Sequence, residues 1–241
     1  PLVGKPTWQW HAKQEAFATR LQADPAAVVS DIAASWTGAF RFKTEVADAD
    51  GRVAPGNEGL RPPQEGGLYA IGMHWSVSAS EPATVVMPTG TGKTETMLCA
   101  VVNYRPGPTL IAVPSDALRF QTAEKFGTLG KLRDLGLVDH GIHNPVVAVV
   151  TKEAVTSADL QLLRGCNIII GVMASLGGKV TAPLLPELAS FVECLFVDEA
   201  HHVPSDTWSE FRERFAGRRI FREEGNQNIT SSMTTAIPVK R

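Results

Sequence analysis

A glycine-rich segment at residues 87–94 has the composition of a loop that holds phosphate groups. It follows the apolar run at 84–86 and leads into a helix-compatible stretch at 95–100, which places it between a strand and a helix. Gly90 and Gly92 let the backbone pass close to a polyphosphate, and the amides there and at the helix start converge on its negative charge. The segment therefore predicts a polyphosphate site at a strand-to-helix turn.

Two side chains at the end of this loop could act on a bound nucleotide. Lys93 would reach the β- and γ-phosphates, and Thr94 would place its hydroxyl on a magnesium ion that bridges them. The residues predicted to contact the phosphates are Pro88, Thr89, Gly90, Thr91, Gly92, Lys93 and Thr94. A Gly-x-Gly-Lys-Thr string arises by chance on the order of once in a hundred chains of this length, so the signal is specific.

A carboxylate pair about a hundred residues further on could complete this chemistry. The run 195–197 is typical of a buried parallel strand, and Asp198 and Glu199 follow at its carboxyl end, where open α/β sheets bind ligands. Asp198 would hold the magnesium ion, and Glu199 would orient and deprotonate the water that attacks the γ-phosphorus. The alternative is that the pair only caps the following helix, and the phosphate loop upstream favours the catalytic interpretation.

The two segments together resemble a known family. The phosphate loop and the string at 198–201, Asp-Glu-Ala-His, resemble motifs I and II of superfamily 2 helicases and translocases, in particular the DEAH-box branch that includes type III restriction subunits. Weaker matches follow in the family's order: Arg-Pro-Pro-Gln at 61–64, the motif Ia-like 113–118 with Gln121, and the motif Ib-like 170–176. Their order and spacing make the resemblance specific.

The resemblance implies roles for residues outside the two strong motifs. Gln64 would read the adenine, and His201 would couple the nucleotide site to a nucleic-acid site. Pro114, Ser115 and Ser175 would contact the nucleic-acid backbone. These roles are carried over from the family at matching positions.

The resemblance also implies the activity, the cofactors and the partners. It covers residues 60–203 and implies the first RecA-like lobe of an ATP-dependent helicase or translocase that uses ATP and Mg²⁺ and acts on nucleic acid, DNA rather than RNA. A chain of 241 residues is too short for the two RecA-like lobes of the family, and it begins with proline, so we expect a processed chain or a fragment. The second lobe, which carries the stimulating arginine finger, is expected to be missing.

One motif of the family is not recognisable. The family has a strand ending in Ser/Thr-Ala-Thr about thirty residues after motif II, whereas here Ile220 runs directly into Phe221. We therefore predict that residues 218–223 lack the long buried strand that carries motif III beside the motif II strand, and that the carboxylate pair is more open as a result. The string at 234–238 matches motif III poorly, and an unstructured tail is expected there.

The charge balance argues against a dedicated nucleic-acid binder. The net charge of −2 provides no strong positive footprint, although a motor needs only a local track of cations. Arg119, Lys125, Lys131 and Arg133 could form part of such a track, or they could belong to a solvated helix face.

No apolar run approaches the length of a membrane span, and no signal peptide is recognisable. Cys99, Cys166 and Cys194 lie far apart in apolar surroundings, which favours small core residues over a metal site or a disulfide. A reducing cytoplasm is the expected compartment, without a membrane partner.

The alternation of apolar strands and helices from residue 60 onward predicts a mainly parallel sheet covered on both faces. With the resemblance, it implies an α/β fold, a RecA-like P-loop NTPase three-layer sandwich, plus an N-terminal helical appendage. Strands are expected near 84–87, 109–113, 146–150, 167–172 and 194–197, and helices near 64–75, 93–103, 116–126, 153–164, 182–191 and 207–215.

The predicted organisation has two parts. Residues 1–56 form an N-terminal helical region and linker, and 57–241 form the ATP-binding lobe with an uncertain tail from about 221. Residues 1–50 are expected to be helical, with Asp24 as an N-cap before Pro25 and a stop near Gly38.

Two other functions remain open. The chain could be a nucleotide-dependent binding module without useful turnover, which the missing motif III and second lobe both favour. It could also be a phosphate-loop kinase or transport ATPase, but those families lack the Arg-x-x-Gln element and the Asp-Glu-Ala-His form of motif II. Stimulation of the ATPase rate by single-stranded DNA would discriminate among these functions.

Overall fold

The computed structural model describes residues 20, 23–88, 90–150, 157–176, 185–199, 209, 212–224 and 236–238. The strands are β1 (Ala83–Val86), β2 (Thr109–Val113), β3 (Val147–Val150), β4 (Ile168–Val172), β5 (Cys194–Asp198), β6 (Arg219–Glu224) and β7 (Ala236–Pro238). The helices are α2 (Pro25–Ser35), α3 (Pro62–Val77), α4 (Lys93–Tyr104), α5 (Asp116–Thr128), α6 (Ser157–Arg164), α7 (Met173–Leu176) and α8 (Leu185–Phe191). Within the described residues, no helix is long and apolar enough to cross a membrane.

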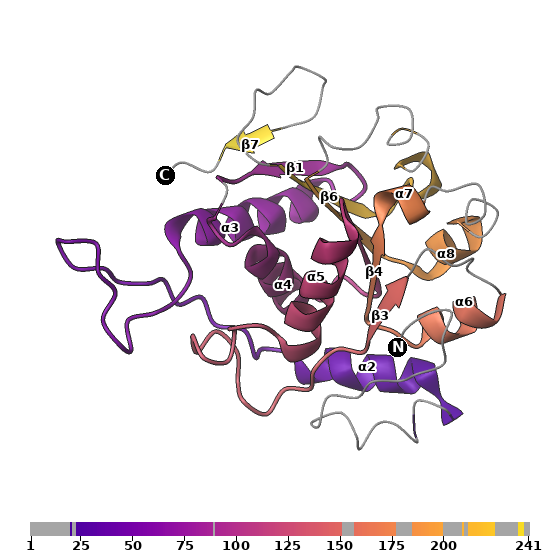
Figure 1. Ribbon diagram of the computed structural model, residues 1–241, viewed down its shortest axis with the longest axis horizontal. Coiled ribbons are helices and arrows are strands. Elements are labelled where there is room, and N and C mark those ends of the chain that lie inside the picture. Colours follow the sequence, from indigo (N-terminus) through magenta and orange to yellow (C-terminus); the bar gives the residue numbers. More distant parts are fainter. Residues whose placement is uncertain are drawn as a thin grey trace.

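The described strands form one seven-stranded parallel sheet with the order β3-β4-β2-β5-β6-β1-β7. Figure 1 shows α3, α4 and α5 on one side of this sheet and α6, α7 and α8 on the other. Strands that are covered on both faces must be apolar throughout, which explains why every residue of β2, β4 and β5 is buried. The predicted α/β sandwich with a mainly parallel sheet is confirmed.

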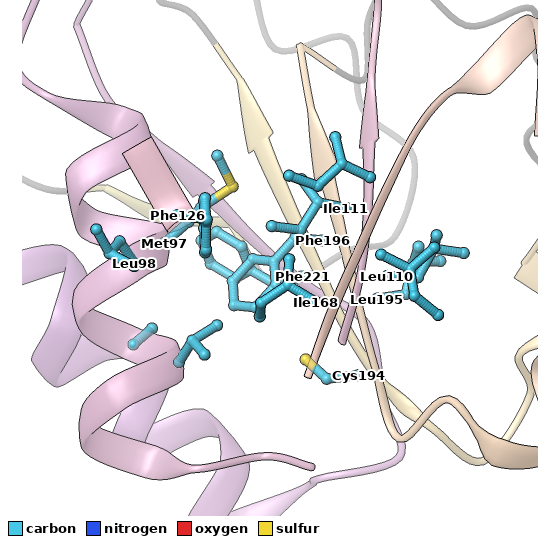
Figure 2. Packing of buried hydrophobic residues seen from close by; sticks show 14 of the residues in the cluster. Met97, Leu98, Leu110, Ile111, Phe126, Ile168, Cys194, Leu195, Phe196 and Phe221 are labelled. Carbon is cyan, nitrogen blue, oxygen red and sulfur yellow. The ribbon is translucent and has the colours of Figure 1, made fainter. Parts of the chain in front are cut away.

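The part of the core around β5 and β6 is built from aromatic rings. Phe196 of β5 and Phe221 of β6 meet edge to face with 5.2 Å between ring centroids, and Trp75 of α3 packs on Phe196 at 6.3 Å. Figure 2 shows Met97, Phe196 and Phe221 on the α4 side of the strands. This packing holds β5 and β6 against α3.

The prediction that residues 218–223 lack a buried strand is wrong. β6 lies between β5 and β1 and is parallel to both, with Phe196 aligned to Phe221 and Asp198 aligned to Glu223. Ile220 and Phe221 are 1% and 0% exposed, so this apolar pair supplies the core contacts of the strand although the motif itself is absent. Asp198 is 7% exposed beside this strand, and the expectation that the carboxylate pair is more open than in a complete lobe stays a prediction.

The tail expected at 234–238 is also partly ordered. Ala236–Pro238 form β7, which pairs with the outer edge of β1. Because β7 is separated from β5 by β6 and β1, this string does not replace motif III beside the carboxylates.

The N-terminal helix is shorter than expected. Asp24 caps α2 as predicted, its carboxylate accepting from Ala27 N at 3.1 Å, but the helix ends at Ser35. Residues 40–60 are not helical, because the backbone at Phe40 and Arg41 pairs with the segment 137–138. The excursion at 44–60 projects from the body (Figure 1).

The helix α2 itself packs on the lobe. Val28, Ile32 and Trp36 belong to the same hydrophobic cluster as the sheet. The boundary at residue 56 stays a prediction.

Candidate nucleotide-binding site

The phosphate loop connects β1 to α4, as the sequence predicts. Gly90 and Gly92 have φ values of 81° and 89°, a left-handed conformation that glycine adopts without strain. A Cβ at Gly90 would meet no atom within 4 Å, whereas one at Gly92 would collide with Gln64 Nε2. The twelve-residue α4 starts at Lys93, so its free amides and the positive end of its dipole face the loop.

A hydrogen bond from a side chain stabilises the first part of the phosphate loop. Thr91 Oγ1 donates to the carbonyl of Pro88 at 2.6 Å, which holds the turn together. Thr94 occupies the second position of α4, directly after Lys93. Thr89 lies outside the described residues. The assignment of these residues to phosphate contacts stays a prediction. The backbone conformation of the loop is compatible with it.

The Arg-Pro-Pro-Gln element touches the phosphate loop directly. Gln64 is 7% exposed, and its Nε2 donates to the carbonyl of Gly92 at 3.2 Å. The Arg61 guanidinium donates to the carbonyl of Gly90 at 2.8 Å, and Arg61 N donates to Gln64 Oε1 at 2.9 Å. Sequence reasoning gave Gln64 only the adenine and gave Arg61 no role, although Arg61 belongs to the same motif. Both side chains hold carbonyls of the two loop glycines.

The second motif meets the first at the carboxyl edge of the sheet. Asp198 is the last residue of β5, and Glu199 follows in a left-handed conformation with a φ of 50°. The Glu199 carboxylate forms an ion pair with Lys93, 106 residues earlier in the chain. The two side chains are 22% and 11% exposed, so water screens the pair only partly. A non-glycine residue with positive φ is uncommon and marks a position that its surroundings hold in place.

The candidate metal ligands are brought to the same region, but their role is not tested. Thr94 lies in the first turn of α4, and Asp198 ends the strand that carries Glu199. Among the described residues, no group of three His, Cys, Asp or Glu side chains forms a metal cluster. A hydroxyl, one carboxylate and phosphate oxygens are nevertheless the ligands with which Mg²⁺ is usually held.

The residues assigned to nucleic-acid contact follow two neighbouring strands. Pro114 and Ser115 come after β2, and Ser115 caps α5 by accepting from Leu118 N at 3.4 Å. Ser175 lies in α7, which follows β4, but its side chain is outside the described residues. Since β2 and β4 are adjacent and parallel, both turns lie at the edge that carries the phosphate loop. His201 lies outside the described residues.

The predicted track of cations is not found. Arg119 is 4% exposed and donates to the carbonyl of Val150 at 2.9 Å. Lys125 pairs with Glu95 at 2.7 Å.

Arg133 donates to Ile142 O and to Asn144 Oδ1, and burial lowers the pKa of its guanidinium. Of the four residues, Lys131 is the exposed one, so neither a continuous track nor a solvated face describes the cluster.

The three cysteines are buried free thiols, as expected. Burial raises the pKa of Cys166 to about 12 and raises that of Cys99 and Cys194 further. Thiols with a raised pKa are poor nucleophiles, which supports their role as core residues.

Several solved structures are similar to the chain. A hypothetical ATP-dependent RNA helicase from Sulfolobus tokodaii matches with a TM-score of 0.52 and 17% identity, over 76% of this chain and 54% of that chain. The UvsW helicase from bacteriophage T4 matches at 0.47 and 17%, over 85% and 60%. The Hef helicase domain from Pyrococcus furiosus matches at 0.44 and 20%, over 68% and 33%. At these identities the likeness concerns the fold, and the chain spans about a third to three fifths of the structures it resembles.

A comparison with curated proteins gave no match. The model of the type III restriction enzyme res subunit family matches residues 57–222, which is more than half of the chain and contains the phosphate loop, the carboxylate pair and the first four residues of β6. The chain therefore belongs to the type III restriction enzyme res subunit family and forms a RecA-like lobe of the superfamily 2 helicase type.

Proposed function

We propose that the chain is the MgATP-binding lobe of a nucleic-acid helicase or translocase, and that DNA is its substrate. The contact between Lys93 and Glu199 carries the proposal. It brings a phosphate-binding lysine and a candidate general base together at the carboxyl edge of a parallel sheet, where such sheets bind ligands. Membership of the family supports the same function.

The described residues fit a bound nucleotide triphosphate with magnesium. Backbone amides at Gly90, Gly92 and the start of α4 would bind the phosphates, and Lys93 would pair with the β- and γ-phosphates. Thr94 and Asp198 would hold Mg²⁺, which when bound neutralises charge on the phosphates. Among the residues that the structure describes, no atom lies within 4 Å of a Cβ placed at Gly90, which is compatible with a phosphate there.

One residue would accept a proton, and another would recognise the adenine. Glu199 would accept a proton from the attacking water, for which its carboxylate must first leave Lys93. The Gln64 amide would keep the hydrogen bond from its Nε2 to the carbonyl of Gly92. The remaining hydrogen-bonding positions of the same amide would recognise the adenine. Nucleotide binding and activation of the attacking water therefore both require that the ion pair between Lys93 and Glu199 opens.

The isolated chain is proposed to turn over slowly. In the family a second lobe supplies an arginine that stabilises the transition state, a contribution of about a thousandfold or more in related systems. β6 also carries Arg222, Glu223 and Glu224 at the position where the family has Ser/Thr-Ala-Thr. This substitution favours a second candidate function, a nucleotide-binding module without useful turnover.

The test combines binding with turnover. MgATP is titrated calorimetrically into the wild type and into Lys93→Ala, and the ATPase rate is measured with and without single-stranded DNA. We expect binding that Lys93→Ala abolishes, slow hydrolysis and no unwinding of a forked duplex. Unchanged affinity in Lys93→Ala would refute the phosphate site, and ATP-dependent unwinding by this chain alone would refute the requirement for a second lobe. Binding without any effect of DNA favours the binding module.

A further inference from the structure

The outer face of α3 carries a row of exposed apolar side chains. Tyr69, Met73 and Val77 are 49%, 71% and 84% exposed, and their spacing of four residues places them along one side of the helix. The opposite side of α3, with Leu68 and Ile71, is buried in the core. Together the three exposed side chains form an apolar stripe. Contiguous exposed apolar side chains of this size are typical of an interaction surface.

The amino end of the apolar stripe is tied to the excursion at 44–60. The Phe42 ring stacks on the Tyr69 ring with 4.9 Å between the centroids and an angle of 5° between the planes. Thr44 Oγ1 donates to the Glu65 carboxylate at 2.7 Å. The base of the excursion is therefore held beside the amino end of the apolar stripe.

This excursion is acidic and projects from the body (Figure 1). Its charged residues are four carboxylates and one arginine, namely Glu45, Asp48, Asp50, Glu58 and Arg52. A projecting segment with this charge balance is complementary to a cationic surface.

A cavity of about 540 Å³ lies at the other end of the apolar stripe, and Val77, Arg218 and Arg219 are among the residues that line it. The segment 212–219, which ends in these two arginines, has four arginines and one glutamate. Glu81 and Glu193 on the wall of the cavity offset only part of this positive charge.

The two arginines of the cavity are available to a partner. The Arg219 guanidinium lies over the Trp75 ring at 5.6 Å, and Arg218 donates to the carbonyl of Ser190 at 3.1 Å. Neither arginine forms an ion pair with a carboxylate of the described residues. The apolar stripe therefore has an acidic excursion at its amino end and a cavity with unpaired arginines at its carboxyl end.

This arrangement is self-complementary under a two-fold axis through Met73. Two antiparallel copies of α3 would place Tyr69 of each copy against Val77 of the other. The same rotation would bring the acidic excursion of each copy to the cavity of the other, so both charge contacts would be attractive. A parallel arrangement would instead bring like charges together.

We propose that the chain forms a two-fold dimer through the apolar stripe of α3, with the excursion of each copy against the arginine-lined cavity of the other. The dimer goes beyond the proposed function, because none of these residues belongs to the phosphate loop or to the carboxylate pair. The surface is small, so the dimer is of the weak, transient class.

Sedimentation velocity of the 241-residue chain at concentrations up to about 200 µM tests the dimer. We expect a monomer–dimer equilibrium that weakens as salt is raised, because the charge contacts lie at the rim of the interface. Met73→Glu should raise the Kd of the dimer at least about 10-fold, because two carboxylates would meet at the axis. Phe120→Glu is the matched control and should leave the Kd unchanged, since Phe120 is 50% exposed but lies on α5.

Charge reversal tests the antiparallel arrangement. Glu45→Lys combined with Asp50→Lys makes the excursion basic but keeps Asp48 and Glu58, whose carboxylates accept from backbone amides of the excursion. Arg218→Glu makes the cavity end acidic. Each variant alone should dimerise more weakly than the wild type. An equimolar mixture of the two should recover association, because every excursion then meets a cavity of opposite charge.

Four outcomes would overturn the inference. The first is a wild type that stays monomeric over the whole concentration range. The second and third are a dimer that Met73→Glu leaves intact and a dimer that Phe120→Glu weakens equally. The fourth is a mixture of the charge-reversed variants that associates no better than either variant alone. Binding of MgATP by Met73→Glu should equal that of the wild type, so the proposed function is judged separately.

Discussion

Replacing Glu199 by glutamine should tighten the binding of MgATP. The Glu199 carboxylate is paired with Lys93, the cation that we assign to the β- and γ-phosphates. The nucleotide must therefore compete with an internal anion for the same lysine. Glutamine keeps the shape of the side chain but removes its charge, so the competition weakens.

The size of the effect follows from the environment of the pair. Both side chains are mostly buried, at 11% and 22% exposure, so the pair is stronger than one on the open surface. A hydrogen bond to a charged group contributes about 1.5–3 kcal/mol, and a neutral amide would keep about 1 kcal/mol of it. The difference of about 0.5–2 kcal/mol corresponds to a Kd lowered by about 2- to 30-fold.

The assay is calorimetric titration with MgATP at fixed ionic strength. Removal of any carboxylate near a phosphate site reduces the general repulsion of the nucleotide, so this contribution must be measured separately. Glu95→Gln provides the control, because Glu95 lies in the first turn of α4, is also 22% exposed and pairs with Lys125 instead of Lys93. The specific effect is the gain in Glu199→Gln beyond the gain in Glu95→Gln.

Three outcomes test whether Glu199 competes with the nucleotide for Lys93. A gain of about 2-fold or more over the control supports competition for Lys93. Equal gains in both variants mean that Lys93 is not held by Glu199 in solution. Weaker binding in Glu199→Gln means that the carboxylate helps to hold the nucleotide, and the reasoning is then refuted. Hydrolysis should be lost in this variant in any case, because the amide cannot accept the proton of water.

Three further predictions address the fold and the loop. Phe221→Ala should lower the free energy of unfolding in urea by about 3–5 kcal/mol, because the ring is fully buried against Phe196. Arg61→Ala should raise the Kd for MgATP several-fold, because it frees the carbonyl of Gly90 and loosens the phosphate loop. Stability should fall above about pH 9, where the Cys166 thiol ionises in the unfolded chain but stays protonated in the fold because its pKa is raised to about 12. Urea titrations at pH 8, 9 and 10 should show a shallower fall in Cys166→Ala, by up to about 1.4 kcal/mol per pH unit.

Each of these predictions has an outcome that contradicts it. A loss below about 1 kcal/mol in Phe221→Ala, similar to that of exposed Phe42→Ala, would mean that β6 does not lie in the sheet. An unchanged Kd in Arg61→Ala would show that the bond to Gly90 does not order the loop. The same pH dependence in Cys166→Ala and the wild type would show that this thiol does not ionise differently on unfolding.

The elements with strong local signals could be predicted from the sequence. The five apolar strands that carry the core, β1 to β5, are found within one residue of the expected bounds, because buried parallel strands are continuous apolar runs. The phosphate loop and the carboxylate pair were placed at the same edge of the sheet because parallel strands align their carboxyl ends. The contact between Lys93 and Glu199 follows from that arrangement.

Other features depend on contacts that local patterns do not reveal. The segment 40–43 is drawn into an extended path by the distant backbone at 135–138, so its helical expectation failed. The arginines at 119 and 133 were expected at the surface. Arg119 instead binds the carbonyl of Val150 at the end of β3 in the interior, and the half-buried Arg133 binds the carbonyl of Ile142 in the segment before β3. In both cases the partner is remote in sequence, and a charge or a propensity alone does not indicate it.

β6 shows why a missing motif does not imply a missing strand. The gap between β5 and β1 must be filled, because both strands present unpaired backbone groups and apolar side chains on each face. Ile220 and Phe221 satisfy the core, and the backbone of the next residues satisfies the two ladders whatever side chains they carry. The structural demand of this position is thus met by two apolar residues, whereas the family's Ser/Thr-Ala-Thr serves function and not the sheet. β6 therefore joins β5 to β1 in one sheet although Arg222, Glu223 and Glu224 stand where the family is expected to have Ser/Thr-Ala-Thr, and on this basis we expect nucleotide binding to survive where coupling to movement does not.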